Sequence, residues 1–143
     1  MKKNYSELFE KMHIAGKLAA NALDELTFFV KPGVSTNFLD KICYEYIKDH
    51  GGNSAPLYYR GFPKPCCVST NHIVCHGIPS EKILKDGDIT NVDVTAFIDE
   101  HHGDTSRMFY IGDVSVKSKN LISATYESMM KAISIIKPGI KLG

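Results

Sequence analysis

Two aspartates, Asp93 and Asp104, have the spacing in this sequence that most suggests chemistry. If a hairpin loop centres on Ile98 and Asp99, the two carboxylates lie directly opposite each other, with Cβ atoms about 5 Å apart. A divalent cation would turn their repulsion into coordination, because carboxylates suit Mn, Co, Fe or Zn in mixed oxygen and nitrogen sites. Alternatively, they belong to the solvated face of an edge hairpin. Spacing alone favours this second interpretation, because outward-facing polar alternation is common in antiparallel sheets.

A second candidate is His76, in the segment NHIVCHGIP over residues 71–79. It precedes a glycine and follows the apolar run 73–75, for which we expect a short strand. An imidazole in this position can project into a cleft for proton transfer or for a hydrogen bond to a substrate carbonyl. A structural role at a strand end is the alternative. Cys67 or Cys75 could instead pair with His76 as a thiol nucleophile, but no third residue is placed to orient the pair.

Aromatic residues are concentrated in a loop that precedes these segments. Tyr58, Tyr59 and Phe62 flank turn-forming residues at 61–65, shortly before Cys67. Such a loop could form an apolar substrate pocket, and ordinary loop packing is the alternative.

The elements that must position these residues indicate an α+β fold. Apolar residues at helical spacing predict a first helix over 8–26, and its inner face is Leu8, Met12, Ala15, Ala19, Ala22 and Leu26. A second helix is expected from Ser35 or Thr36 to the Gly51-Gly52 stop, with Leu39, Ile42, Tyr46 and Ile47 inside. Short β-branched runs predict strands at 67–69, 73–75 and 89–98, and 101–111 is expected to return as the second arm of a hairpin. Residues 118–136 regain helical spacing, with Leu121, Ala124, Ser128 and Ala132 or Ile135 as the expected inner face.

One short pattern occurs twice. The first helix is followed by VKPGV at residues 30–34 and the last by IKPGI at 136–140. Proline followed by glycine is common after helices, which explains a single short match. As a duplication, the pattern would mark a second structural half that begins near 110–143 and is truncated.

The overall composition excludes several functional classes. The chain has 143 residues with a formal net charge of +1, so it lacks the basic surface typical of nucleic-acid-binding proteins. The amino terminus has no apolar stretch suited to a signal peptide or membrane anchor, and the four cysteines include no C-x-x-C pair. We therefore expect a cytoplasmic protein with reduced thiols and no membrane partner.

Taken together, these motifs resemble the methionine aminopeptidases. The resemblance rests on VCHGIP (74–79), NVDVT (91–95) and HGDTS (102–106), supported by MHIAGKLAA (12–20), KPGVST (31–36) and LKDGDI (84–89). They span essentially the whole chain in family order. The absence of an amino-terminal zinc-binding extension matches the short bacterial-type class.

The resemblance implies the first half of a pseudo-symmetric pita-bread fold, an antiparallel sheet with helices packed on one face. It further implies two divalent metal ions, with Asp104 bridging them and Asp93 binding one. A metal-bridging water would attack the scissile carbonyl and remove the initiator methionine from nascent proteins whose second residue is small. His76 would bind the substrate and stabilise the tetrahedral intermediate, and Tyr59, Phe62 and Cys67 would line the methionine pocket.

Several expectations follow for the protein as a whole. The family's remaining ligands, one His and two Glu, belong to a second half, so we expect residues 1–143 to be the amino-terminal part of one catalytic domain and inactive alone. The complete enzyme is expected to be a monomer that can associate with the ribosome. A proline-specific peptidase of the same fold and a pita-bread module that only binds peptides or partners are the alternative functions.

Overall fold

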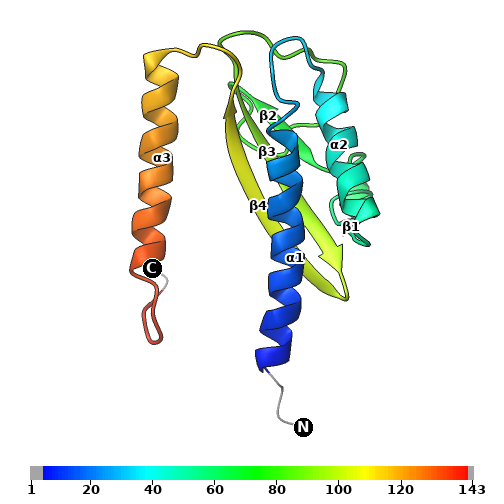
Figure 1. Cartoon of the computed structure of the whole chain (residues 1–143). Helices are drawn as coiled ribbons and strands as arrows, with labels where there is room; N and C mark the ends of the chain where they lie inside the picture. Colours follow the sequence, from blue (N-terminus) through cyan, green and yellow to red (C-terminus); the bar gives the residue numbers. More distant parts are fainter. Residues whose placement is uncertain (1–4, 142–143) are drawn as a thin grey trace.

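The computed structural model describes residues 5–141 as three helices around a small antiparallel sheet (Figure 1). The elements are α1 (Tyr5–Leu26), α2 (Thr36–Asp49), β1 (Asn53–Ser54), the short 3-10 helix η1 (Tyr59–Gly61), β2 (Cys67–Thr70), β3 (Ile89–Ile98), β4 (His101–Tyr110) and α3 (Val116–Ser134). The expected α+β class is confirmed. Within residues 5–141, no helix is long and apolar enough to cross a membrane.

Helix α2 begins near the residue that the sequence predicted, and glycines follow the ends of α1 and α2 as expected. Ser35 is the N-cap of α2, where its hydroxyl accepts a hydrogen bond from the Phe38 amide at 3.1 Å. Beyond α2, Gly51 takes a φ of +80°, and in the turn between the helices Gly33 takes +90°. These are left-handed conformations that glycine adopts without steric cost.

The predicted inner face of α1 is correct over its last three turns only. Ala15, Ala19, Ala22 and Leu26 are fully buried, whereas Met12 is 52% exposed and Leu8 is half-buried. The first turns of α1 extend past the end of the sheet (Figure 1), so they have nothing to pack against.

Strand β3 is the centre of the sheet. Strand β4 pairs with it along its whole length, from Ile98 opposite His101 to Ile89 opposite Tyr110. On the other edge of β3, β1 pairs near one end and β2 near the other. The residues between β1 and β2 therefore form a loop that leaves the sheet and returns to the same edge.

The β3–β4 turn corrects the register that we expected. Its central residues are Asp99 and Glu100, with φ of 48° and 65°, rather than Ile98 and Asp99. Two successive left-handed residues are typical of the tight hairpin turn whose twist matches that of the strands. A β-branched residue such as Ile98 does not tolerate that conformation, whereas aspartate does.

The core lies between one face of the sheet and helices α1 and α2. From β3 it takes Val92, Val94 and Ala96, all fully buried, together with the buried faces of the two helices. On β4, Gly103 lies opposite Ala96 of β3 and allows α1 to approach the sheet closely. A Cβ atom on Gly103 would lie 2.1 Å from the Ala15 carbonyl.

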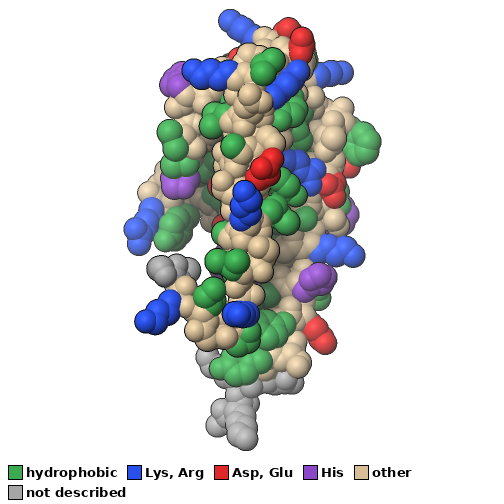
Figure 2. Space-filling view, turned by 90° about the vertical axis from the view of Figure 1, so that its left-hand side faces the viewer, with side chains coloured by type: hydrophobic (Ala, Val, Ile, Leu, Met, Phe, Trp, Pro, Cys, Tyr) green, Lys and Arg blue, Asp and Glu red, His purple; other side chains and the backbone are tan. Residues whose placement is uncertain are grey.

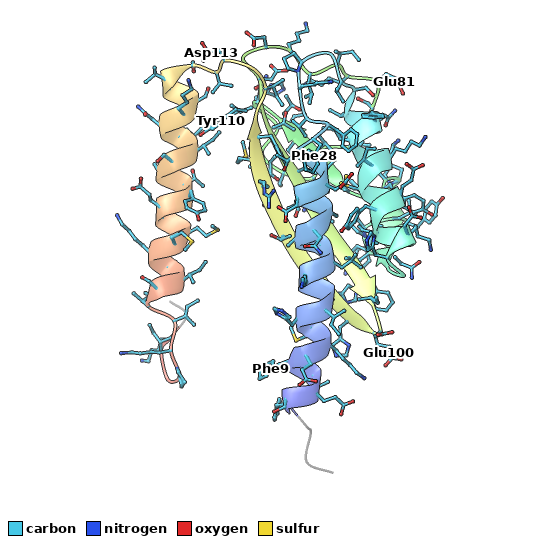
Figure 3. All side chains as sticks on the ribbon, viewed as in Figure 1. Phe9, Phe28, Glu81, Glu100, Tyr110 and Asp113 are labelled. Atoms are coloured by element: carbon cyan, nitrogen blue, oxygen red, sulfur yellow. The ribbon has the colours of Figure 1, made fainter. Side chains whose placement is uncertain are left out.

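Two expected elements differ from the structure. Residues 73–75 form no strand; they belong to an irregular segment between Thr70 and Ile89. Helix α3 exists, but no residue of it is buried, so its expected inner face is wrong. Leu121, for example, is 60% exposed. Figure 3 shows α3 standing apart from α1, α2 and most of the sheet. Its apolar residues have helical spacing but pack against no neighbouring element closely enough to be buried.

Candidate metal centre

Asp93 and Asp104 lie on one face of the sheet but not directly opposite each other. Asp93 is opposite Ser106, and Asp104 is opposite Thr95. They are therefore diagonal neighbours on the two strands, a relation that places α-carbons about 7–8 Å apart. The register shift is an even number of residues, so the expected sharing of a face is confirmed although the direct opposition is wrong. Thr95 Oγ1 donates a hydrogen bond to Asp104 Oδ1 at 2.8 Å.

The charge environment of Asp93 favours a cation. Its carboxyl group is partly removed from water, and this burial raises its pKa, as does the negative charge of Asp104. The nearby imidazole of His76 acts in the opposite direction and lowers the pKa. Asp93, Asp104 and His76 are therefore close enough to interact electrostatically.

His76 is held beside β2 by the glycine that follows it. The Gly77 amide donates to Ser69 Oγ at 3.1 Å, and the Gly77 carbonyl accepts from the Val68 amide at 2.9 Å. A Cβ atom on Gly77 would lie 2.3 Å from the Val68 carbonyl oxygen, so only glycine allows this approach. His76 itself takes a φ of 54°. Ser69 is a supporting residue that sequence reasoning missed, because nothing in its local pattern indicates a partner eight residues later.

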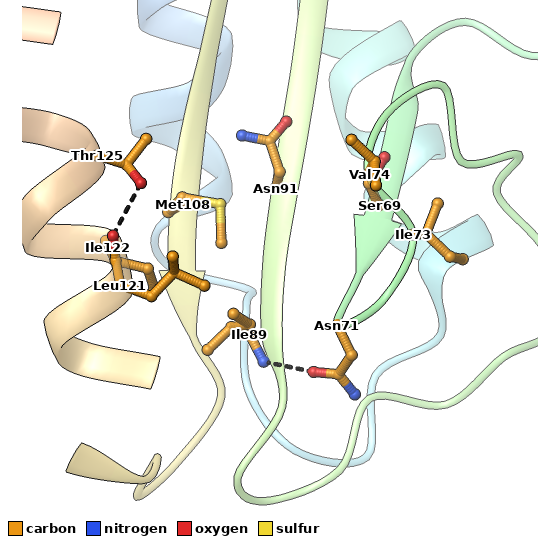
Figure 4. Close-up of a pocket in the computed structure, with 10 residues that line it drawn as sticks. All are labelled: Ser69, Asn71, Ile73, Val74, Ile89, Asn91, Met108, Leu121, Ile122 and Thr125. Atoms are coloured by element: carbon orange, nitrogen blue, oxygen red, sulfur yellow. Dashed lines mark hydrogen bonds between the residues drawn. The ribbon is translucent and has the colours of Figure 1, made fainter. Parts of the chain in front are cut away.

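The other end of the His76 segment is held by Asn71. Its Nδ2 donates to Asp88 Oδ1 at 2.8 Å, while its Oδ1 accepts from the Ile89 amide at 3.0 Å (Figure 4). Burial alone would raise the pKa of Asp88, but the hydrogen bonds from Asn71 and the Lys85 amide, with the charges of Lys82 and Lys85, lower it overall. Asn71 has a φ of 56°, a conformation in which asparagine is enriched. Asparagine before an apolar run is the sequence signal that could have identified this turn.

Cys67 lies next to the carboxylates as a buried thiol. It is opposite Asp93 in the β2–β3 ladder and is 7% exposed. Its burial raises its pKa to about 11, helped by the charges of Asp93, Cys75 and Asp104. The thiol therefore stays protonated near neutral pH, which disfavours a nucleophilic role.

The expected pocket residues Tyr59 and Phe62 lie on the loop between β1 and β2. The Ala55 amide donates to the Thr95 carbonyl at 3.0 Å where the loop leaves the sheet, and the loop returns at Cys67, opposite Asp93. Its two ends thus lie beside Asp93 and Thr95. Tyr59 is 64% exposed and Phe62 is half-buried, so the two rings do not form a closed pocket.

A groove of about 320 Å³ lies beside the carboxylates, between α3, the sheet and residues 71–74 (Figure 4). It is lined by Ser69, Asn71, Ile73, Val74, Ile89, Asn91, Met108, Leu121, Ile122 and Thr125. Ser69 and Asn91 form the next cross-strand pair on the same face of the sheet after Cys67 and Asp93. The groove is therefore adjacent to the carboxylates but is not lined by them.

The carboxylates suit a divalent ion as part of a larger ligand set. Their hard oxygen donors come from neighbouring strands on one face, and a cation would offset both the burial and the Asp104 charge that raise the pKa of Asp93. Within residues 5–141, no group of three His, Cys, Asp or Glu side chains is placed to hold a metal ion.

The chain is similar in sequence and structure to known peptidases. It is 56% identical to the methionine aminopeptidase of Rickettsia prowazekii over 135 residues, which cover 94% of this chain and 52% of that protein. A crystal structure of methionine aminopeptidase from the same organism superposes with a TM-score of 0.95 at 55% identity, covering 96% of this chain and 56% of that one. The chain thus spans about half the length of the curated relatives it matches.

More distant structures share the fold. A Xaa-Pro dipeptidase from Bacillus anthracis superposes with a TM-score of 0.81 at 22% identity, covering 92% of this chain and 36% of that one. The expected pita-bread architecture is thereby confirmed for the part that this chain represents. The model of metallopeptidase family M24 matches residues 10–143. The chain therefore belongs to metallopeptidase family M24.

Proposed function

We propose that this chain supplies part of the active site of a methionine aminopeptidase, which removes the amino-terminal methionine from nascent polypeptides whose second residue is small. The observation that carries the proposal is the grouping of Asp93, Asp104 and His76 in a chain about half identical to proteins named methionine aminopeptidase. A proline-specific peptidase has less support, because the Xaa-Pro dipeptidase shares the fold at much lower identity.

We further propose that Asp93 and Asp104 are two ligands of a site for two divalent ions, drawn from Co, Mn, Fe or Zn. The remaining ligands, one His and two Glu, would come from a second half of the same domain. The length of the relatives and the repeated K-P-G pattern support this domain organisation. When bound, the ions would supply Lewis acidity and lower the pKa of a water molecule.

The side chains of this chain would bind and orient the substrate. His76, beside β2, would donate a hydrogen bond to the scissile carbonyl and to the charge that develops on its oxygen. Tyr59, Phe62 and Cys67 would contact the methionine side chain, with Cys67 contributing a neutral, apolar thiol. Asp93 and Asp104 would hold the cations through their carboxylate oxygens.

The test uses the protein expressed from its complete coding sequence. We expect it to bind divalent metal and to release methionine from a Met-Gly-Met peptide. Replacing either ligand, Asp93→Asn or Asp104→Asn, should lower metal content and reduce activity by about 100-fold or more. This loss exceeds the one usually seen when a residue that only supports a metal ligand is replaced. Asp99→Asn, at the exposed hairpin turn, is the matched control and should leave both properties unchanged.

Two outcomes would contradict the proposal. Failure of the complete protein to hydrolyse the peptide under all four metals would favour the peptide-binding module instead. Full activity in both ligand variants would show that the carboxylates do not hold the ions.

A further inference from the structure

We propose that Asp40 is a positioning residue for substrate binding: from helix α2, its carboxylate fixes the returning end of the loop that carries Tyr59 and Phe62. We call residues 64–66 the return stem of this loop and residues 58–61 its tip. The inference rests on the proposed function, because it assigns that loop to the methionine pocket.

Asp40 is a buried acid that the metal centre does not use. It is 5% exposed and lies on the face of α2 that packs into the molecule. Its Oδ1 accepts hydrogen bonds from the Cys66 amide at 3.1 Å and from the Cys66 thiol at 3.4 Å. A buried carboxylate is costly unless it is paired, so these contacts explain how the charge is tolerated.

Lys64 completes the attachment from within the loop. Its Nζ lies 3.8 Å from Asp40 Oδ2 and donates to Asn37 Oδ1 at 2.7 Å. Asn37 in turn donates from Nδ2 to Glu81 Oε1 at 2.5 Å. Figure 3 shows Glu81 near the start of α2. The network thus joins the return stem, α2 and the segment that leads towards β3.

The loop is attached to the rest of the molecule mainly at its return stem. Besides the contacts of Lys64 and Cys66, the Pro65 carbonyl accepts a hydrogen bond from the Ser54 hydroxyl. The tip is held by bonds within the loop, such as Tyr58 amide to Phe62 carbonyl at 2.8 Å and Tyr59 amide to Pro56 carbonyl at 3.0 Å. Arg60 and both tyrosines of the tip are exposed. The position of the tip therefore depends on where the stem is fixed.

The stem also leads directly into the metal centre. Cys66 is followed by Cys67, which is opposite Asp93. A displaced stem would move Tyr59 and Phe62 relative to the carboxylates while leaving Asp93 and Asp104, which the β3–β4 ladder fixes, in place. Losing Asp40 should thus weaken substrate binding more than it slows the chemical step.

Limited proteolysis of the protein expressed from its complete coding sequence tests the attachment without any need for activity. Trypsin can cut after Arg60 in the tip, and Lys131 in exposed helix α3 is a reference site remote from the network. We expect Asp40→Ala to accelerate cleavage after Arg60 by about tenfold, because cleavage follows local opening and a charge-assisted hydrogen bond is lost. Cleavage after Lys131 should not change.

Three variants separate anchoring from general destabilisation. Asp40→Asn keeps an oxygen acceptor for Cys66 and should restore most of the protection. Asp49→Ala, an exposed aspartate on the same helix, should behave as the parent chain. If Asp40→Ala unfolds and both sites are cut faster, Lys64→Met decides: selective cleavage after Arg60 supports the anchor, and the parent rate at Arg60 overturns it.

Steady-state kinetics of the complete metal-loaded protein then tests the role in binding. We expect Lys64→Met and Asp40→Ala to raise KM for Met-Gly-Met about tenfold, with kcat within about twofold of the parent value. Unchanged KM in variants with an opened tip would overturn the positioning role. If the parent protein hydrolyses nothing, the proposed function fails and this role in substrate binding is overturned with it, whereas the proteolysis result still decides whether Asp40 anchors the loop.

Discussion

Alternate residues of strand β3 face two different environments. Thr90, Val92, Val94 and Ala96 are buried against the helices, whereas Asn91, Asp93 and Thr95 are only half-buried on the opposite face. The first face is covered by α1 and α2 and is filled with apolar side chains. The second holds Asp93 and Asp104, and burial together with the negative charge of Asp104 raises the pKa of Asp93. One face of β3 thus serves packing, whereas the other carries a repulsion between carboxylates that packing alone does not require.

Helix α3 lies on the side of the sheet that α1 and α2 leave uncovered. Its apolar residues, including Leu121, Tyr126 and Met129, are exposed by 60%, 59% and 48%. Figure 2, which faces the side where α3 lies, shows hydrophobic side chains at this surface among basic ones. The apolar residues of α3 are therefore exposed where those in the last turns of α1 are buried, although both helices are followed by the same K-P-G pattern.

The largest effect is expected where α1 touches the packed face. Gly103→Ala would place a Cβ atom 2.1 Å from the Ala15 backbone, and no flexible side chain is available to move aside. We expect a loss of more than about 4 kcal/mol in the free energy of unfolding, measured by urea denaturation of the 143-residue chain. Gly16→Ala is the matched control, because a Cβ there meets nothing within 4 Å, and it should stabilise helix α1 by up to about 1 kcal/mol. Equal stability of the two variants would contradict the close approach.

A pair of leucines compares the two helices directly. Leu26 on α1 is fully buried, and Leu121 on α3 is 60% exposed. We expect Leu26→Ala to cost about 2–5 kcal/mol through lost burial and a cavity, and Leu121→Ala to change the free energy of unfolding by about 0.5 kcal/mol or less. A comparable cost for both in urea denaturation would mean that α3 is packed in solution.

The sequence predicted features that depend on local patterns. The alternation along β3, the start of α2 near Ser35 or Thr36 and the shared face of Asp93 and Asp104 follow from patterns that act within one or two elements. The turn register was missed by one position at its centre, although the φ requirement of Asp99 and Glu100 could have corrected it.

Other features depend on contacts between segments far apart in the chain. Nothing near Gly103 or Gly77 indicates that their missing side chains make room for Ala15 and Val68. The hydrogen bond from the Cys66 amide to Asp40 joins residues 26 positions apart, and no periodicity predicts it. The separation of α3 from the rest of the molecule likewise cannot be predicted from helical periodicity, because the pattern specifies an apolar stripe but not the element that packs against it.

On the polar face, removing a charge should stabilise the fold. Asp93→Asn deletes a partly buried carboxylate that interacts unfavourably with Asp104. In the presence of a metal chelator, we expect the free energy of unfolding to rise by about 1 kcal/mol or less, the scale of a cross-strand pair. Asp99→Asn at the exposed turn serves as the control and should change stability by less. A clear loss of stability in Asp93→Asn, measured in the same urea experiment, would show that the carboxylate is held by favourable contacts instead.

The smallest expected effect is the pH dependence that the buried Asp40 of α2 gives to the free energy of unfolding. Burial raises the pKa of Asp40 above its ordinary 3.8, against the opposing effects of Cys66 and Lys64. The folded state therefore binds the proton more tightly than the unfolded state does, so this contribution to stability is complete below pH 3.8 and is lost as pH rises through the folded pKa. Asp40→Asn cannot titrate, so the difference in free energy of unfolding between variant and parent should grow in favour of the variant across that window. Its slope cannot exceed about 1.4 kcal/mol per pH unit, the value for one proton. Urea denaturation of both chains at a series of acidic pH values measures the difference, and a constant difference throughout would show that the pKa of Asp40 is the same in the folded and the unfolded chain.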